Sequence, residues 1–437
     1  MRRNTVDPGP KAARTRLDGD RLALVTRTDP LVTPLTPARA RWALLALALG
    51  GFGIGATEFV AMGLLPDLAR DLLPALYAES PGVANAQAGW LVSAYALGVV
   101  VGAPTIAAVA ARYPRKQLLL VLVAAFTVGT VASALLPSFG LVLVARFAAG
   151  LPHGAYFGIA ALVAASIMGP DKRGRGIAVV LSGLTIANVI GVPSITYLGQ
   201  VTSWRVAYLA VAVIFALTFL AILALVPLQA GDPTATVGRE LQVFTRPQVW
   251  LALLVGAFGF GGFFAVYTYI APLATEVARL PATAVPLILV GIGIGMTLGN
   301  FLGGWTADRH VMGSVFAYFA LFVVALGGLL VTASTAPGLA IFAGLVGFSA
   351  SALSPAIQTR LMDVAGDSQT LAAALNHASL NIGNSLGAFL GGVTIAAGYG
   401  YLSPTLVGLV LCGPGIALAV ASVLVQRAGR ARLPVPA

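Results

Sequence analysis

Two charged residues, Glu58 and Arg146, stand inside long apolar runs of this chain. An ionised side chain at the centre of a lipid bilayer costs at least a few kcal/mol, so each should face a partner or a water-filled cavity. Glu58 lies eight residues before Pro66, and Arg146 lies six residues into its run. At a rise of about 1.5 Å per residue, they sit about 12 Å and about 9 Å below the same membrane face. The similar depth permits a Glu58–Arg146 pair.

Such a pair could carry a proton. Burial favours the neutral form of a carboxylic acid, whereas a neighbouring guanidinium, which stays charged, favours the ionised form. Small rearrangements could therefore move the proton affinity of Glu58 across neutral pH, while Arg146 tunes that affinity or fixes helix geometry. The alternative interpretation is a permanently ionised structural ion pair. Asp67, just past Pro66 at the outer edge of the run, is either a further proton-coupling residue or an exposed interfacial acid.

Histidines and amides add polar groups to two other runs. His153 lies seven residues after Arg146 and therefore shares its helical face, and the Pro and Gly beside it predict a local kink. It could bind substrate, relay protons or serve as a hydrogen-bonded structural histidine. His377 heads a stripe with Asn381 and Asn384. A one-sided polar stripe in a membrane helix faces protein or water rather than lipid.

Polar and aromatic side chains inside apolar runs predict the lining of a cavity. The candidates are Tyr95, His153, Tyr156, Asn188, Phe260, Phe263, Phe264, Tyr267, Tyr269, Asn300, His377, Asn381 and Asn384. A mostly apolar cavity with a few hydrogen-bonding groups suits small amphipathic or weakly polar solutes. Helix packing and interfacial anchoring are the alternative explanations of the aromatic residues. The separated histidines and the single Cys412 give no metal-site spacing, so neither a metal nor a cofactor is expected.

The elements that carry these side chains are long apolar runs. Hydrophobic residues make up 58% of the chain and charged residues 9%, compared with about 25% charged in soluble domains. Each run is long enough to cross a hydrocarbon core of about 30 Å. The predicted membrane spans are 42–65, 88–110, 118–137, 140–168, 176–199, 204–228, 248–273, 284–305, 313–334, 337–360, 371–397 and 403–426.

Positive charge predicts the orientation. With the N-terminus inside, nearly all of the 26 Lys and Arg residues lie on the cytoplasmic side, apart from Arg70, Arg205 and Arg279 outside and Arg146 in a span. The positive-inside rule therefore places both termini in the cytoplasm, which requires an even number of spans. This asymmetry and the anionic inner leaflet explain the net charge of +11. Nucleic-acid binding, the rival explanation of a pI of about 10.2, is disfavoured.

Short segments recur roughly 200 residues apart along the chain. Asn188–Gly191 is echoed by Asn384–Gly387, and the basic segment after Ala111 is echoed by the segment after Ala307. Such a repeat predicts two six-helix halves. The predicted domains are a disordered basic cytoplasmic tail 1–41, an N-terminal bundle 42–228, a cytoplasmic linker 229–247, a C-terminal bundle 248–426 and a cytoplasmic tail 427–437.

The segment Gly55–Asp67 resembles the first helix of bacterial exporters of the major facilitator superfamily. It is most similar to the arabinose-efflux-like and chloramphenicol-resistance-like branch of the drug:proton antiporters, and Ile190–Pro193 resembles their Gly-Pro-containing motif in a loosened form. The resemblance implies an all-α polytopic membrane protein with twelve transmembrane helices in two pseudo-symmetric six-helix bundles, the major facilitator fold. It also implies proton coupling at Glu58 and Arg146, which match the first-helix acid and the fourth-helix arginine of related antiporters.

The loop after the second predicted span resembles the G-x-L-A-D-R-x-G-R-K motif of that superfamily. The residues kept are Arg112, Arg115 and Lys116, with Asp308 and Arg309 in the second-half copy, whereas Ala107, Ala111 and Pro114 replace the usual Gly, Asp and Gly. A basic cluster there can bind helix C-termini or acidic groups of a neighbouring bundle in one conformation and release them in another, which predicts a gating role. The alternative is that these residues only hold the topology.

These features together predict a proton-coupled exporter of small amphipathic or weakly polar solutes such as drugs, in the bacterial cytoplasmic membrane. The alternatives are an exporter of sugars or another native metabolite, an uptake symporter, or a non-transporting membrane sensor. An enzyme is not expected, because no Gly-x-Ser-x-Gly, Walker-type or His-Glu-x-x-His sequence occurs. The expected partners are lipid, a small-molecule substrate and protons, without nucleic acid, and the expected assembly is a monomer.

Overall fold

The computed structural model describes residues 35–110, 112–169, 172–231, 242–365 and 369–431. Most of the predicted basic tail 1–41, up to position 34, lies outside the described residues. Ala111 of the predicted gating loop, 232–241 of the predicted linker and 432–437 of the predicted C-terminal tail also lie outside them.

Within the described residues, 12 helical segments are long and apolar enough to cross a membrane. The first half comprises α2 (Pro37–Gly63), α5 (Pro81–Ala88) with α6 (Trp90–Ala110), α7 (Arg115–Leu135), α8 (Phe139–Gly150) with α9 (His153–Met168), α10 (Arg173–Ile186) with the π-helix η2 (Ala187–Gly191) and α11 (Val192–Val201), and α12 (Trp204–Leu225). The second half comprises α14 (Pro247–Thr268), η5 (Ala282–Ala284) with α16 (Val285–Ala307), α17 (Val311–Thr332), α18 (Ala336–Ala365), α19 (Gln369–Thr394) with the π-helix η6 (Ile395–Tyr399), and α20 (Ser403–Ala431). The predicted all-α fold with twelve spans is confirmed.

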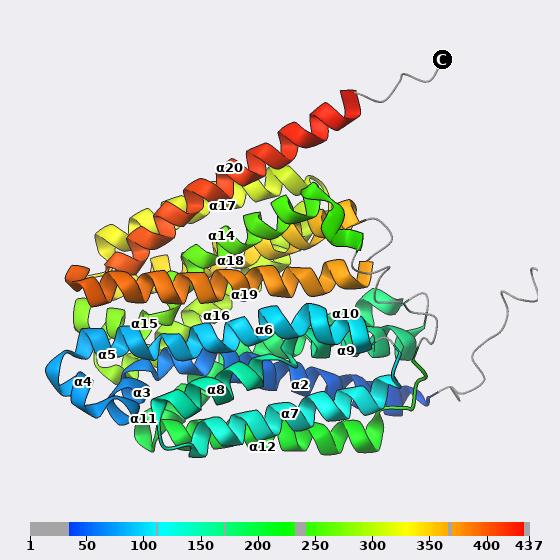
Figure 1. Ribbon diagram of the computed structural model, residues 1–437, viewed down its shortest axis with the longest axis horizontal. Coiled ribbons are helices and arrows are strands. Elements are labelled where there is room, and N and C mark those ends of the chain that lie inside the picture. The colour runs from blue at the N-terminus through cyan, green and yellow to red at the C-terminus, as the bar shows by residue number, and fades with distance from the viewer. Residues whose placement is uncertain (1–34, 111, 170–171, 232–241, 366–368, 432–437) are drawn as a thin grey trace, which may run out of the picture.

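The two halves form two groups of helices that lie side by side (Figure 1). Within the first half, α2 packs against α10 and α12, and within the second half α14 packs against α19 and α20. The groups meet where α6 contacts α19 and where η2 and α11 contact α16. We call the face where α2 begins and α20 ends, on the right in Figure 1, the terminal face, and the other the opposite face.

The connection between the first two spans differs from the prediction. Instead of a loop, the chain forms α3 (Leu65–Leu72) and α4 (Pro74–Glu79), and the second span begins at Pro81 rather than at position 88. Pro81 stands in the first turn of α5, where its missing N–H is tolerated, and the Ser80 hydroxyl accepts a hydrogen bond from the Val83 amide at 3.5 Å. The apolar pattern alone does not reveal these helices, because they carry charged and polar residues.

The two halves are closed against each other at the opposite face. Asn85 Nδ2 of α5 donates to the Tyr401 hydroxyl at 2.7 Å, and Gln200 Nε2 of α11 donates to the Ala282 carbonyl at 3.0 Å. Deeper in the seam, Gly293 of α16 approaches the Asn188 carbonyl so closely that a Cβ atom would overlap it. Glycine at this position therefore allows the two halves to meet.

Two helix breaks aim polar side chains at the seam. The fourth span is interrupted at Pro152, so that α9 begins at His153, as the Pro and Gly there predict. In the fifth span the π-helix η2, which carries Asn188, precedes Pro193 in the first turn of α11. Proline cannot donate a backbone hydrogen bond, so both breaks occur where the helical ladder loses a donor.

Candidate functional site

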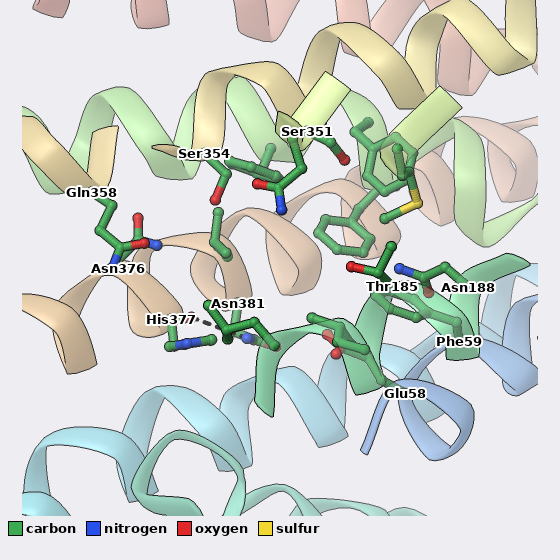
Figure 2. Close-up of a pocket in the computed structure, with 18 of the residues that line it drawn as sticks. Glu58, Phe59, Thr185, Asn188, Ser351, Ser354, Gln358, Asn376, His377 and Asn381 are labelled. Carbon is green, nitrogen blue, oxygen red and sulfur yellow. Dashed lines mark hydrogen bonds between the residues drawn. The ribbon is translucent and has the colours of Figure 1, made fainter. Parts of the chain in front are cut away.

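A cavity lies between the two halves, and side chains from both halves line it (Figure 2). The lining residues are Glu58, Phe59, His153, Leu181, Leu184, Thr185, Asn188, Phe260, Phe263, Phe264, Met296, Thr297, Asn300, Ser351, Ser354, Gln358, Asn376, His377, Leu380 and Asn381. The cavity extends from Glu58 towards Gln358 and Asn376, which lie near the terminal-face ends of α18 and α19. A solute in it would contact both halves at once.

Many of the sequence candidates are in this lining, and others are not. Those that line the cavity are Glu58, His153, Asn188, Phe260, Phe263, Phe264, Asn300, His377 and Asn381, whereas Tyr95, Tyr156, Tyr267, Tyr269 and Asn384 do not. Sequence reasoning missed Gln358 and Asn376, although an amide inside an apolar run is the same signal that marks Asn381. Phe59 was also missed, because an aromatic residue in an apolar run gives no sign of which way it faces.

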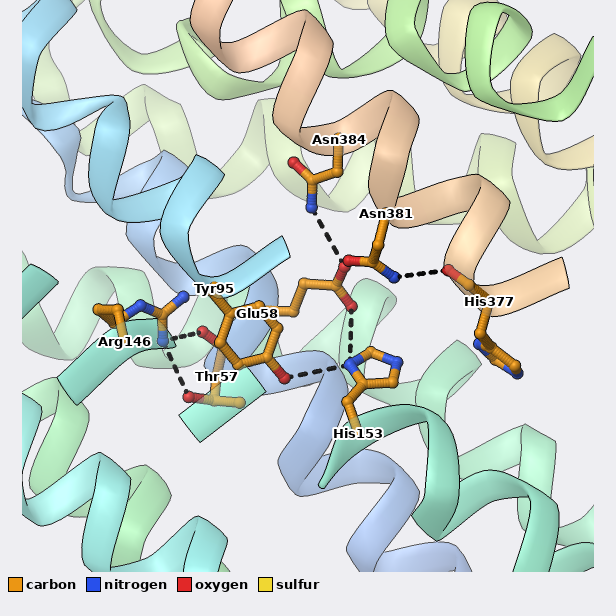
Figure 3. Close-up of polar contacts among 8 residues, drawn as sticks. All are labelled: Thr57, Glu58, Tyr95, Arg146, His153, His377, Asn381 and Asn384. Atoms are coloured by element: carbon orange, nitrogen blue, oxygen red, sulfur yellow. Dashed lines mark hydrogen bonds and ion pairs between the residues drawn. The ribbon is translucent and has the colours of Figure 1, made fainter. Parts of the chain in front are cut away.

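Glu58 joins the two halves within the protein interior. Its carboxylate accepts a hydrogen bond at Oε1 from Asn384 Nδ2 of α19, at 3.3 Å (Figure 3). Its Oε2 lies 3.9 Å from His153 Nδ1 of α9. Glu58 is buried to 5% exposure, and Asn384 is fully buried. The acid is therefore shared between the first half, which carries it, and the second half, which supplies its hydrogen-bond donor.

The Glu58–Arg146 pair, which the similar depth of the two residues permits, is not formed in this structure. Among the described residues no ion pair joins Glu58 to Arg146; instead, Arg146 Nη1 donates to the Thr57 carbonyl at 3.1 Å and to the Thr57 hydroxyl at 3.3 Å. The guanidinium also lies over the rings of Tyr95 and Tyr208, with its Cζ 4.4 Å and 5.5 Å from their centroids. Successive residues of a helix point about 100° apart, so Arg146 meets Thr57 while Glu58 turns to the seam.

His153 is positioned by three aromatic neighbours. Its Nδ1 is 3.1 Å from the Tyr95 hydroxyl, and its ring centroid is 5.7 Å from that of His377 on α19. His377 in turn stacks on Phe157 with centroids 5.1 Å apart and ring planes 1° from parallel. The buried Tyr95 thus lies behind His153, away from the cavity, while both histidine rings face it.

The remaining aromatic candidates do not line the cavity and have structural partners instead. The Tyr156 hydroxyl donates to the Leu47 carbonyl at 2.8 Å, and the Tyr269 hydroxyl donates to the Ala388 carbonyl at 2.7 Å. Tyr267 stacks on Phe263 with centroids 4.9 Å apart. These three tyrosines therefore support the wall instead of forming its surface.

Asp67 lies on α3, beyond the end of the first span. Its carboxylate is 3.5 Å from the guanidinium of Arg70, one helical turn away. Partial burial raises the pKa of Asp67 above its ordinary value, and Arg70 opposes that rise. This position places Asp67 at the opposite face, separate from the cavity.

The basic loops contact their own halves in this conformation. Lys116 Nζ donates to the Leu223 carbonyl of α12 at 2.8 Å. Arg309 donates to the Trp305 carbonyl at 2.7 Å and lies over the Trp305 ring at 3.7 Å. Arg115 is half-buried, and Arg112 and Asp308 are exposed at the same face.

A further buried charge was not expected. Arg360, at the end of the predicted span 337–360, is buried in α18, where its Nη2 donates to Gln248 Oε1 and to the Ser422 hydroxyl, each at 3.0 Å. The sequence places Arg360 at the membrane boundary, so its charge looks solvated. The longer α18 keeps it inside the second half instead.

Comparison with known proteins identifies the family. Residues 47–324 match the Major Facilitator Superfamily. The chain is 37% identical to "Inner membrane transport protein YdhP" of Escherichia coli K12, over 87% of this chain and 95% of that protein. It is 33% identical to "Putative transporter AraJ" of the same organism (82% and 89% covered) and 32% identical to a "Chloramphenicol resistance protein" of Streptomyces lividans (86% and 94% covered). The chain therefore belongs to the Major Facilitator Superfamily of transporters and is a multi-pass membrane protein, which confirms the resemblance seen in Gly55–Asp67.

A solved structure has the same fold. The bacterial homologue of the human lysosomal transporter Spinster, in an inward-facing and occupied conformation, has a TM-score of 0.71 with 17% sequence identity, covering 92% of this chain and all of that one. Identity at this level supports the fold alone.

Proposed function

We propose that this chain is a proton-coupled exporter of small amphipathic or weakly polar solutes that works by alternating access. The observation that carries the proposal is the position of Glu58, a buried carboxylate that lines the cavity and accepts a hydrogen bond from Asn384 of the other half. A carboxylate at this position can exchange a proton with the cavity, and its contact with α19 must change when the halves move. Proton occupancy and the arrangement of the halves are thereby linked.

The charge distribution supports an orientation. Of the Lys and Arg residues that the structure describes outside the spans, most lie at the terminal face, so we place that face in the cytoplasm. Because the opposite face is closed by the Asn85–Tyr401 and Gln200–Ala282 hydrogen bonds, the described conformation is inward-facing. Inward movement of a proton then supplies the drive, about 2.3 kcal/mol per charge for a potential of about 100 mV.

The cavity lining supports an amphipathic solute. Phe59, Phe260, Phe263 and Phe264 form an aromatic surface near Glu58, and amide and hydroxyl side chains of α16, α18 and α19 face the same space. Within the part of the chain that the structure describes, Glu58 is the single acid of the lining, and no Lys or Arg contributes to it. Such a lining can accommodate a solute that has an apolar ring and a few hydrogen-bonding groups. It offers no cation to bind an anionic solute.

A sugar or another native metabolite is the second candidate substrate. Neutral hydrogen-bonding side chains make up a large part of the lining, including Thr185, Asn188, Asn300, Ser354 and Gln358. A hydroxyl-rich solute would satisfy them.

Proton movement in liposomes tests the proposal. Purified protein is reconstituted with a pH-sensitive dye inside, a pH gradient is imposed, and chloramphenicol or arabinose is added. Wild type should move protons when one of these solutes is added, and Glu58→Gln should reduce that movement at least about tenfold, because an amide cannot exchange a proton. Glu79→Gln is the matched control, since Glu79 is exposed on α4.

The outcomes separate the parts of the proposal. Proton movement that survives in Glu58→Gln would remove Glu58 from the coupling role, and an Asp67→Asn variant would then show whether Asp67 holds the proton. Solute transport without proton movement in wild type would exclude coupling altogether. A response to arabinose but not to chloramphenicol would favour the sugar exporter.

A further inference from the structure

His153 and His377 come from different halves of the molecule and meet beside Glu58. Their ring centroids are 5.7 Å apart, and His153 Nδ1 lies 3.9 Å from Glu58 Oε2. Figure 3 shows the side chains of Glu58, His153 and His377 next to one another in that order. Tyr95 lies on the side of His153 that faces away from His377. The three residues thus form a row of titratable side chains at the cavity surface.

His377 is the most exposed residue of this row. Glu58 and His153 are 5% and 2% exposed, whereas His377 is half-buried at the cavity surface. His377 lies one helical turn closer than Asn381 to the terminal-face end of α19, where the cavity leads towards Gln358 and Asn376. The halves are hydrogen-bonded to each other at the opposite face, whereas the cavity extends from Glu58 in this direction, so a proton leaving Glu58 can follow the cavity.

The other titratable groups around Glu58 do not offer an equivalent route. They are Tyr95, Arg146 and Tyr267, with Tyr208 beside Arg146. Phenols and guanidinium groups exchange protons only at far higher pH than imidazoles, so histidine is the side chain suited to relay a proton near neutral pH.

Resting on the proposed proton coupling at Glu58, we propose that His153 and His377 relay the coupling proton from Glu58 to the terminal-face end of the cavity. In the starting state of this relay the Tyr95 hydroxyl, 3.1 Å from His153 Nδ1, is the donor, and the proton of the neutral imidazole is on Nε2. The Tyr95 hydroxyl turns away from Nδ1, and the Glu58 O–H bond breaks as an N–H bond forms at Nδ1, through one water or after the 3.9 Å separation has shortened. The Nε2–H proton passes to a nitrogen of His377 directly or through one water. His377 then releases that proton to the cavity, which leaves Glu58 ionised and both histidines neutral. Proton exchange with water in the cavity, which removes the proton from Nδ1 and returns one to Nε2, restores the starting tautomer.

The contact with Phe157 explains how His377 is held for this task. Its ring lies parallel to that of Phe157, which fixes the ring plane while leaving the nitrogens at the ring edge available. Phenylalanine at position 377 would keep this stack and remove only the proton-carrying nitrogens. His377→Phe is therefore the informative variant, and His310→Phe is its matched control, because His310 is exposed just before α17.

Infrared difference spectroscopy after a pH jump tests the relay without a known substrate. The carboxylic-acid C=O band of Glu58 is identified by its loss in Glu58→Gln, and its decay after an upward jump gives the rate of proton release. We expect His377→Phe to slow this decay at least about tenfold, with an unchanged final amplitude, and His310→Phe to match wild type. Imidazole added to the solution should restore the rate in His377→Phe, which a merely structural role of His377 would not allow.

Two results would overturn the relay in different ways. A decay as fast in His377→Phe as in wild type, or a slow decay that imidazole does not restore, would exclude the relay and leave Glu58 as the coupling site. If no Glu58-dependent carboxyl band titrates in wild type, the proposed proton coupling fails and the relay fails with it.

Discussion

Arg146 is held by a backbone carbonyl, a hydroxyl and two aromatic rings, and no carboxylate of the described residues forms an ion pair with it. Within the part of the chain that the structure describes, two of its nitrogen atoms, Nε and Nη2, have no hydrogen-bond partner, so the rings of Tyr95 and Tyr208 take a large share of the charge stabilisation. This arrangement matters for Glu58, because the acid can gain or lose a proton without breaking an ion pair.

Lysine at position 146 should stabilise the folded protein less than arginine does. We expect Arg146→Lys to lower the free energy of unfolding by about 1–3 kcal/mol, because an ammonium lacks the planar fork that bonds Thr57 and stacks on the tyrosines. Thermal unfolding in detergent measures the change, with the exposed Arg70→Lys as control. If Glu58→Gln destabilised the protein as much as Arg146→Lys, a Glu58–Arg146 ion pair would be indicated instead.

At the scale of elements, the seam between η2 and α16 depends on a small residue. Gly293 allows α16 to approach the Asn188 carbonyl, whereas Gly291, two residues earlier on the same helix, faces open space. The contrast arises because residues two apart on a helix point in different directions.

Alanine at these two glycines should affect transport differently. Gly293→Ala should reduce transport at least about tenfold, because a methyl group there pushes the two halves apart at the closed seam. Gly291→Ala should leave transport unchanged. Solute flux in liposomes measures both, and equal activity of the two variants would show that the seam tolerates separation.

At the scale of the whole molecule, transport requires the opposite face to open. The Asn85–Tyr401 contact joins α5 to the connection before α20 and closes that face. Alternating access therefore requires this contact to break once in each cycle.

A cross-link at this contact should arrest transport reversibly. With cysteines in place of Asn85 and Tyr401, in a Cys412→Ser background, a short cleavable cross-linker should stop flux, and cleavage should restore it. The buried Cys412 is the chain's single cysteine, so the labelled sites are defined. The two single-cysteine variants should keep flux after the same treatment, and continued flux in the linked double variant would argue against opening at this face.

The sequence predicts much of this architecture for a clear physical reason. Crossing a hydrocarbon core requires long apolar helices, so the spans are visible as runs, and a charge inside a run, such as Glu58, is visible as an exception. Polar helices such as α3 and α4 lack that contrast. The burial of Arg360 was missed because it lies at the boundary of a run, where the same residue could equally reach water.

The sequence by itself determined the class of protein, the spans and the polar residues inside them, because membrane insertion depends on local composition. Only the tertiary structure decided which of these residues meet. Asn384 contacts Glu58 across 326 positions of sequence, and Arg146 contacts Thr57 instead of its neighbour Glu58. The depth of a residue in the membrane follows from its position along one helix. The direction in which its side chain points depends on how that helix is rotated against its neighbours, and packing between helices sets that rotation.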